Sequence, residues 1–381
     1  MSLTGSKIVS IEQDWKYLCR PIDANYVRIT DHNSIRTVSD KPHAEGVSWA
    51  YANLSSARNT NWNREKIKLV CRDYPFTLED RIIPSKNSCL DARLARMNKG
   101  VHDNSMWEWD ESNAVAPETE PLYNARVVGG KWDGKRAVNA GGHGFRVNNI
   151  TGDNNLIVLW EDILVDSIDE DAFHARADGR SQRVYMKNLW TSGLDMGVAP
   201  VGISGYGMYL RALADSRIEG GGWQGALGTF IDICADVTLS GPYIGGASSG
   251  ATHSVTMKGC KRVSLTDGFK ILDFNKSGLN LIQSSAANQC VRNNITNGWI
   301  MSDNLDLGNT YYGVELEDSS MWNILQGLQI GYKNVWTAEN RLHTGVLEIE
   351  TCDYNEVGPN AYHQCQTADV TLVGVNSTDH Q

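Results

Sequence analysis

One short pattern occurs eight times in the middle of this chain: an apolar residue, a residue that would face outward, and a second apolar residue. Its copies start 23 to 35 positions apart. They are Phe145-Arg146-Val147, Phe173-His174-Ala175, Met208-Tyr209-Leu210, Ile231-Asp232-Ile233, Val255-Thr256-Met257, Leu279-Asn280-Leu281, Val314-Glu315-Leu316 and Leu347-Glu348-Ile349. A repeat of this length is typical of a solenoid of stacked coils. Because the alternation has period two, the coils are predicted to consist of strands.

A second pattern precedes most copies: an apolar strand, a turn and an aromatic residue, as in Val184 to Trp190. Each coil therefore has at least two strands and is expected to have three, paired in parallel about 4.8 Å from the next coil. The predicted fold is all-β, a parallel β-helix of about 8–10 coils. Residues 1–66 lack the repeat and are expected to form an N-terminal cap, with a helix near residues 46–58. Residues 67–365 are the predicted β-helix, and 366–381 the C-terminal tail.

Composition excludes some partners. The net charge of −10 argues against nucleic acid, which requires a concentrated basic surface, but a local basic patch would still accept an anionic polysaccharide. No apolar run approaches the roughly 18 residues of a membrane span. The eight cysteines include no CxxC pair, so the sequence indicates neither a zinc site nor a dense disulfide framework. Cys234, Cys260 and Cys290 lie about one coil apart and are expected to stack as buried thiols.

Three segments carry a resemblance to a known family. They are Ile82-Ile83-Pro84-Ser85 with Leu90-Asp91, Gly129-Gly130-Lys131-Trp132-Asp133-Gly134, and Gly141-Gly142-His143-Gly144-Phe145. Over about residues 67–365 the chain resembles the right-handed parallel β-helices of the pectate-lyase superfamily, which includes polygalacturonases, polysaccharide lyases and phage tailspike depolymerases. The resemblance implies a right-handed helix and a carbohydrate substrate, and leaves the reaction open. No secretory signal is visible in the first thirty residues. Together with this, the resemblance implies a viral or prophage origin, an extracellular or virion-associated location, and a homotrimer.

The repeat register arranges the outward residues in two columns on one face. The first column is Arg146, His174, Tyr209, Asp232, Thr256, Asn280, Glu315 and Glu348. The second is Asn148, Arg176, Arg211, Cys234, Lys258, Ile282, Glu317 and Glu350. The first coils are therefore cationic and titratable, and the last ones are acidic. Neighbouring members lie one strand spacing apart, within reach of one substrate.

The cationic part of these columns suits β-elimination on a uronic-acid polysaccharide. Arg176 and Arg211 would neutralise the sugar carboxylate, and His174 or Tyr209 would remove the proton beside it. An arginine next to His174 would disfavour the imidazolium form and so favour the base. Further substrate contacts are predicted for four residues of the columns and the segment before them: Arg146, Asp232, Lys258 and His143.

A competing hypothesis uses the acidic segment before the His174 strand. Asp169 and Asp171 would serve as the paired carboxylates of a glycoside hydrolase, because crowded carboxylates raise one another's pKa. The segment is similar to the acidic loop of β-helix polygalacturonases, but here Gly142-His143-Gly144 precedes the acids by a coil, whereas that family has this segment after them. The alternative is a solvated acidic turn or a calcium site. No other cofactor is expected.

Twelve tryptophans support a third hypothesis, a non-catalytic glycan-binding or structural spike. Trp190 and Trp223 recur at one place in the coil and are predicted to stack on sugar rings. The alternative is that such residues pack beneath the turns as core aromatics.

Overall fold

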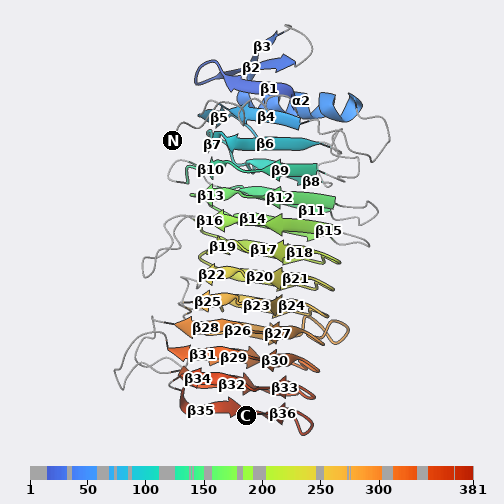
Figure 1. Cartoon of the computed structure of the whole chain (residues 1–381), viewed down its shortest axis with the longest axis vertical. Helices are drawn as coiled ribbons and strands as arrows, with labels where there is room; N and C mark the ends of the chain where they lie inside the picture. Colours follow the sequence, from blue (N-terminus) through green and yellow to red (C-terminus); the bar gives the residue numbers. More distant parts are fainter. Residues whose placement is uncertain are drawn as a thin grey trace, which may run out of the picture.

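The computed structural model describes residues 15–31, 37–57, 68–72, 75–84, 88–110, 125–136, 139, 141–149, 157–177, 183–191, 203–245, 253–272, 274, 276–302, 312–332, 342–363 and 365–380. Three long sheets, here named A, B and C, run the length of the molecule. Their strands pair in parallel except in an N-terminal hairpin. Figure 1 shows the coils stacked along the long axis from the blue N-terminal end to the red C-terminal end. The predicted parallel β-helix is confirmed.

Sheet C is built from one strand per coil and carries the repeated pattern. In spatial order its strands are β8 (Trp107–Asp110), β11 (Phe145–Asn149), β14 (Phe173–Ala177), β17 (Met208–Arg211), β20 (Thr229–Asp232), β23 (Val255–Lys258), β26 (Ser277–Ile282), β29 (Tyr312–Leu316), β32 (Leu342–Glu348) and β35 (Cys365–Thr371).

Sheet B consists of short strands that follow the turns. Its members are β5 (Phe76–Leu78), β7 (Arg96–Lys99), β10 (Lys131–Asp133), β13 (Leu164–Asp166), β16 (Trp190–Thr191), β19 (Gly222–Trp223), β22 (Tyr243–Gly245), β25 (Lys270–Leu272), β28 (Trp299–Ser302), β31 (Gln329–Tyr332) and β34 (Ala361–His363).

Sheet A includes the N-terminal hairpin and continues to the last described strand. Its members are β3 (Thr37–Pro42), β2 (Tyr26–Asp31), β1 (Trp15–Pro21), β4 (Lys68–Arg72), β6 (Cys89–Leu94), β9 (Ala125–Val128), β12 (Ile157–Glu161), β15 (Arg183–Lys187), β18 (Arg217–Glu219), β21 (Thr238–Ser240), β24 (Ser264–Thr266), β27 (Asn294–Thr296), β30 (Ile324–Gln326), β33 (Glu356–Val357) and β36 (Thr378–Asp379). Strands β35 and β36 pair with β32 and β33, so the ladders continue beyond residue 365.

The register of sheet C follows the apolar positions of the repeat. Phe145 pairs with Phe173 and Phe173 with Met208, and all three side chains are fully buried. Burying these side chains in a narrow core is the main favourable term for stacking the coils. The residues between them alternate outward, as the period of a strand requires.

Two of the eight copies are in a different register from the prediction. Thr229, not Ile231, pairs with Met208, because the buried Thr229 hydroxyl accepts a hydrogen bond from Trp223 and so satisfies its polar group in the core. In the last copy Val346, not Leu347, pairs with Val314. The predicted outward position of Glu348 is therefore wrong, and its side chain is buried.

Two interior ladders connect successive coils, and the first consists of three cysteines. Cys234, Cys260 and Cys290 are buried free thiols, as predicted. The outward position that the second column gave Cys234 is therefore wrong. Burial raises the pKa of Cys234 and of Cys290 to about 12, which keeps both protonated.

The second ladder consists of Asn293, Asn323 and Asn355, each of which accepts a hydrogen bond from the preceding turn. Asn355 also donates to Glu348 at 2.8 Å. The Glu348 carboxylate accepts three further hydrogen bonds, from Ser377 Oγ, Val373 N and Gly374 N. Glu348 is thus a buried structural carboxylate.

A helix, α2 (His43–Ala57), lies with the β1–β3 hairpin at the N-terminal end in Figure 1. It occupies the region where a helix was predicted. Glu79 of the first coil accepts hydrogen bonds from the amides of Ala44 and Glu45, and its negative charge suits the helix N-terminus. Val47 is fully buried against the core.

These contacts fix α2 to the first coil. Among the described residues, the structure contains no helix with the length and apolar character needed to cross a membrane.

Candidate functional site

The outward residues of sheet C form two columns, as predicted, but with some changed members. The first column reads Glu108, Arg146, His174, Tyr209, Phe230, Thr256, Asn280, Glu315 and Leu347. The second reads Asp110, Asn148, Arg176, Arg211, Asp232, Lys258 and Ile282. Asp232 therefore lies beside Arg211, and Phe230 takes the place predicted for Asp232 beside Tyr209.

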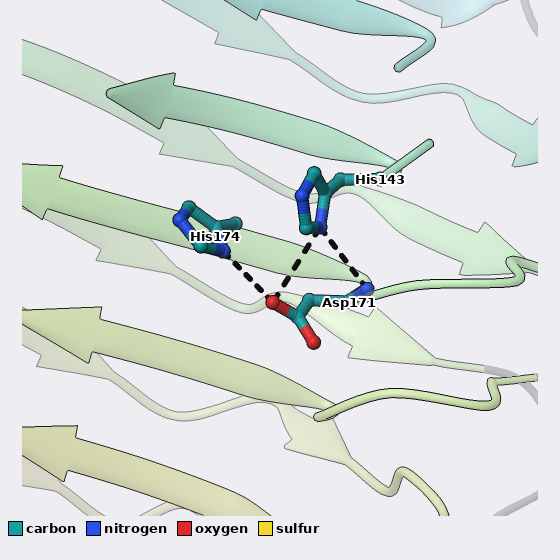
Figure 2. Close-up of side chains that lie close together, drawn as sticks. All are labelled: His143, Asp171 and His174. Carbon is teal, nitrogen blue, oxygen red and sulfur yellow. Dashed lines mark hydrogen bonds and ion pairs between the residues drawn. The ribbon is translucent and has the colours of Figure 1, made fainter. Parts of the chain in front are cut away.

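His174 of the first column forms a hydrogen-bonded pair with Asp171, which precedes β14; we name this pair the dyad (Figure 2). Nδ1 of His174 lies 2.8 Å from Oδ2 of Asp171. The other carboxylate oxygen accepts the amide of Tyr206 at 2.8 Å. With the ring proton on Nδ1, the lone pair of His174 is on Nε2, and the described residues offer Nε2 no hydrogen-bond partner. This is the arrangement of a histidine base oriented by a carboxylate.

A glycine allows the hydrogen bond between the Tyr206 amide and Asp171. A Cβ at Gly205 would lie 2.5 Å from Oδ1 of Asp171 and 2.9 Å from its backbone nitrogen. Any side chain at this position would therefore separate the Tyr206 amide from the carboxylate. The local sequence Gly205-Tyr206-Gly207, immediately before β17, thus contributes to the site in the neighbouring coil.

His143 lies on the other side of the dyad. Its Nδ1 accepts the Asp171 amide at 3.1 Å, and its Nε2 is 2.8 Å from Oε2 of Glu170. This hydrogen bond lowers the pKa of Glu170 to about 2. The His143 ring is 4.5 Å from the His174 ring, centroid to centroid. His143, predicted only as a substrate contact, is therefore tied to the loop that presents Asp171.

An aromatic stack extends from His174 along the first column. The His174 and Tyr209 rings are 4.5 Å apart and nearly parallel at 11°, and Phe230 continues the stack at 5.7 Å from Tyr209. Tyr206 flanks both Tyr209 and Phe230. Sequence reasoning missed Tyr206, which precedes its strand, and Phe230, which the misplaced register concealed. The Tyr206-Gly207-Met208-Tyr209 spacing could have indicated that both tyrosines lie near one strand start.

Burial sets the protonation of the two stacked groups. It lowers the pKa of His174, against the opposing effect of the Asp171 hydrogen bond, and only 15% of the His174 side chain is exposed. Burial raises the pKa of Tyr209, against the opposing hydrogen bond from Arg211. At neutral pH His174 is therefore neutral and Tyr209 is protonated. The pair presents a proton acceptor next to a proton donor.

Arg176 and Arg211 lie next to each other in the second column, on paired positions of β14 and β17. Arg211 forms an ion pair with Asp232 at 3.3 Å. Two guanidinium groups on adjacent strands favour an anionic ligand. Lys258 follows Asp232 in the same column.

Arg146 is differently placed. It forms ion pairs with Asp110 at 2.8 Å and Glu108 at 3.2 Å, which lie on β8, two coils from His174 on the N-terminal side. Its predicted contact with substrate stays a prediction.

The acidic segment does not form the expected carboxylate pair. Asp169 accepts the Gly141 amide and lies 3.7 Å from Arg136, whereas Asp171 belongs to the dyad. Glu170 has a lowered pKa, so the expectation that crowding raises the pKa of an acid in this segment is not met there. The Asp169 and Asp171 carboxylates accept hydrogen bonds from different backbone amides, an arrangement unlike the convergent oxygens of a calcium site.

The two tryptophans predicted to bind glycan have different environments. Trp223 is fully buried and donates its indole N–H to Thr229, so its predicted contact with sugar is wrong. Trp190 is 40% exposed, but it belongs to β16 of sheet B, not to the sheet that carries His174. Of the described residues, those that stack along the site are Tyr206, Tyr209 and Phe230.

Among the described residues, two groups bring three possible metal ligands together: His143 with Asp171 and His174, and His253 with Glu315 and Glu317. In the first group Nδ1 of each histidine already has a hydrogen-bond partner, Asp171 N at 3.1 Å or Asp171 Oδ2 at 2.8 Å. This group is therefore held together by hydrogen bonds among its own members.

Searches with family models and with curated protein sequences match nothing. Solved structures of similar shape include two A-modules of Azotobacter vinelandii mannuronan C-5 epimerases. For AlgE4 the identity is 14% and the TM-score 0.48, over 89% of this chain and 96% of the other. For AlgE6 the values are 13% and 0.43, over 88% and 93%. ORF18 of Geobacillus virus E2 is 9% identical with a TM-score of 0.38, over 93% of this chain and 66% of the other. No residue role, substrate or activity follows from likeness of this degree.

Proposed function

We propose that this chain cleaves a uronic-acid-containing polysaccharide by β-elimination at the dyad. The observation that carries the proposal is the nearly parallel stacking of Tyr209 on a His174 ring whose Nδ1 is held by Asp171. This arrangement supplies an oriented base beside a protonated acid. The adjacent Arg176 and Arg211 supply the positive charge that such a substrate requires.

In the proposed reaction, Nε2 of His174 takes the proton from the carbon that bears the sugar carboxylate. Arg176 and Arg211 hold that carboxylate and stabilise the charge that develops on it. The electron pair forms a carbon–carbon double bond as the bond to the leaving glycosidic oxygen breaks, and the Tyr209 hydroxyl donates a proton to that oxygen. Because His174 and Tyr209 stack on one sheet face, both act from the same side of the sugar ring.

The alternatives have less support in the arrangement of side chains. A hydrolase requires two carboxylates about 5–9.5 Å apart on either side of the scissile bond, whereas Asp169 and Asp171 are engaged by separate protein donors. A glycan-binding spike requires exposed aromatic faces but has no need of an oriented histidine. Each alternative is an outcome of the experiment below.

The test is incubation with a panel of anionic polysaccharides, read by ultraviolet absorbance of the unsaturated uronate and, in parallel, by reducing ends. We expect both signals to rise with the wild-type chain. The rate of absorbance increase should be about 10²–10⁴-fold lower in His174→Ala and in Tyr209→Phe, because this is the usual contribution of a positioned acid or base to a rate. The matched controls are His363→Ala and Tyr185→Phe, which alter exposed residues on sheets B and A.

Other results would overturn the proposal. Reducing ends without ultraviolet absorbance indicate hydrolysis, and binding without either signal on a polymer indicates a spike. Deuterium uptake from heavy water without cleavage would retain His174 as a base but contradict elimination.

A further inference from the structure

A second cluster of polar side chains lies on sheet C, toward the C-terminal end. It consists of His253 before β23, Lys276 before β26, and Glu315 and Glu317 in and after β29. Strand β29 is five strand spacings from β14, or about 24 Å at about 4.8 Å each. The cluster is therefore separate from the dyad and shares no residue with it.

Three of these side chains converge on one point. One ligand atom each of His253, Glu315 and Glu317 lies within 4.8 Å of the other two. Oε2 of Glu315 accepts a hydrogen bond from Ser277 Oγ at 2.5 Å and lies 3.6 Å from Nδ1 of His253. Only 5% of the Glu315 side chain is exposed. Two ionised carboxylates this close repel each other, and either a shared proton or a positive charge between them relieves the repulsion. Burial and the neighbouring Glu315 raise the pKa of Glu317 to about 7.

The histidine of this cluster differs from those of the dyad in one respect. Nδ1 of His253 is enclosed and has no hydrogen-bond partner among the described residues. Nδ1 of His143 and of His174 have such partners at 3.1 Å and 2.8 Å. An enclosed polar atom without a partner is unfavourable, and here it faces two carboxylates.

We propose that His253, Glu315 and Glu317 bind one divalent transition-metal ion. One imidazole nitrogen with two carboxylates suits zinc and its neighbours, whereas calcium prefers a shell of oxygens. Bonds of about 2.1 Å place the ligand atoms of one ion within about 4.2 Å of each other, so a small closure of the two glutamate side chains completes the contact. Asn280, which donates to Glu317 at 3.0 Å, orients that carboxylate from outside the ligand set.

Lys276 competes with the ion in this site. Its Nζ lies 3.1 Å from Nε2 of His253. An ammonium donates there, which leaves the ring proton on Nδ1. Metal binding requires that proton on Nε2, and therefore that Lys276 turn away, as its flexible four-carbon side chain allows. The ion then replaces the positive charge that the lysine supplied.

The experiment is a titration of the full, reduced chain with zinc alone by isothermal calorimetry, after treatment with a chelator. We expect one equivalent to bind at the cluster. Glu317→Gln and His253→Gln should weaken this binding at least about tenfold, and Lys276→Met should strengthen it. Glu350→Gln, an exposed acid one coil further on, is the matched control and should bind as the wild type. Cobalt absorption spectra distinguish the site from cysteine, because this ligand set gives no sulfur-to-cobalt charge-transfer band.

Three outcomes would overturn the proposal: no zinc binding by the wild type, binding unchanged in both Glu317→Gln and His253→Gln, or weaker binding in Lys276→Met. Thermal melts verify that each variant is folded. The polysaccharide assay with His174→Ala is independent of these measurements, so the failure of the metal proposal and that of the lyase proposal are distinguishable.

Discussion

Asp171 and His174 are three residues apart in the chain, and the sequence analysis assigned them to two different reactions. The acidic segment pointed to a hydrolase and the histidine to a lyase, because spacing alone does not show where a side chain turns. In the structure the carboxylate turns back to Nδ1 of His174 and to the Tyr206 amide. The two hypothetical sites thus share one residue pair, and in the proposed reaction the acid is a positioning group for the base.

Asp171→Asn tests this role. The amide retains the size of the side chain but no longer fixes the ring proton on Nδ1, so we expect kcat to fall by about 10²–10⁴-fold with little change in KM. The measurement is steady-state kinetics on the polymer identified in the absorbance assay. Asp267→Asn, at an exposed turn of sheet A, is the control and should retain full activity. An active Asp171→Asn chain would contradict the dyad.

The pH profile of kcat/KM gives a second test. Burial lowers the pKa of His174 below its ordinary value of 6.5. The base is therefore active at neutral pH, and activity should be lost only as the pH falls through a value below 6.5. Because Asp171 raises the pKa of His174, Asp171→Asn should move this acid limb to still lower pH. A limb above 6.5, or one that Asp171→Asn leaves in place, would contradict the assignment.

At the scale of the strand, hydrophobic period predicted the fold and most of the register. It failed where a polar residue is buried or an apolar one is exposed. Ile231-Asp232-Ile233 matches the pattern better than Thr229-Phe230-Ile231, yet the latter is in register, because Trp223 satisfies the Thr229 hydroxyl in the core. Such a contact between two sheets is not visible in a single strand. The same limitation concealed Phe230 from the predicted site, whereas Tyr206 was missed because it precedes its strand.

The asparagine ladder leads to a prediction about stability. Asn323→Ala would remove hydrogen bonds to Asn293 and Asn355 and leave buried polar groups unpaired. We expect a loss of about 1–3 kcal/mol for each such group, measured as a lower denaturant midpoint. Asn294→Ala, which alters a partly exposed side chain on β27, is the matched control and should change stability by less than about 0.5 kcal/mol. Equal effects of the two substitutions would contradict a stabilising ladder.

At the scale of the whole molecule, the period of the repeat was sufficient to predict three stacked sheets and an outward face on one of them. Composition alone could not reveal that Arg176 and Arg211 meet on a chain of net charge −10, since that depends on the register of distant segments. The homotrimer and the extracellular or virion-associated location stay predictions from the resemblance. Light scattering tests the first, with an expected mass three times the 42.1 kDa of a single chain.

The N-terminal hairpin and α2 have a consequence for how such molecules behave in solution. Without β1, strand β4 would present unpaired amides and carbonyls to any neighbour with a matching edge. Every coil of a parallel solenoid has such an edge, so one molecule could add to the next with the same spacing that joins its own coils. By pairing β1 with β4 and anchoring α2 through Glu79, the N-terminal segment covers this edge, so we expect a chain without that segment to associate end to end.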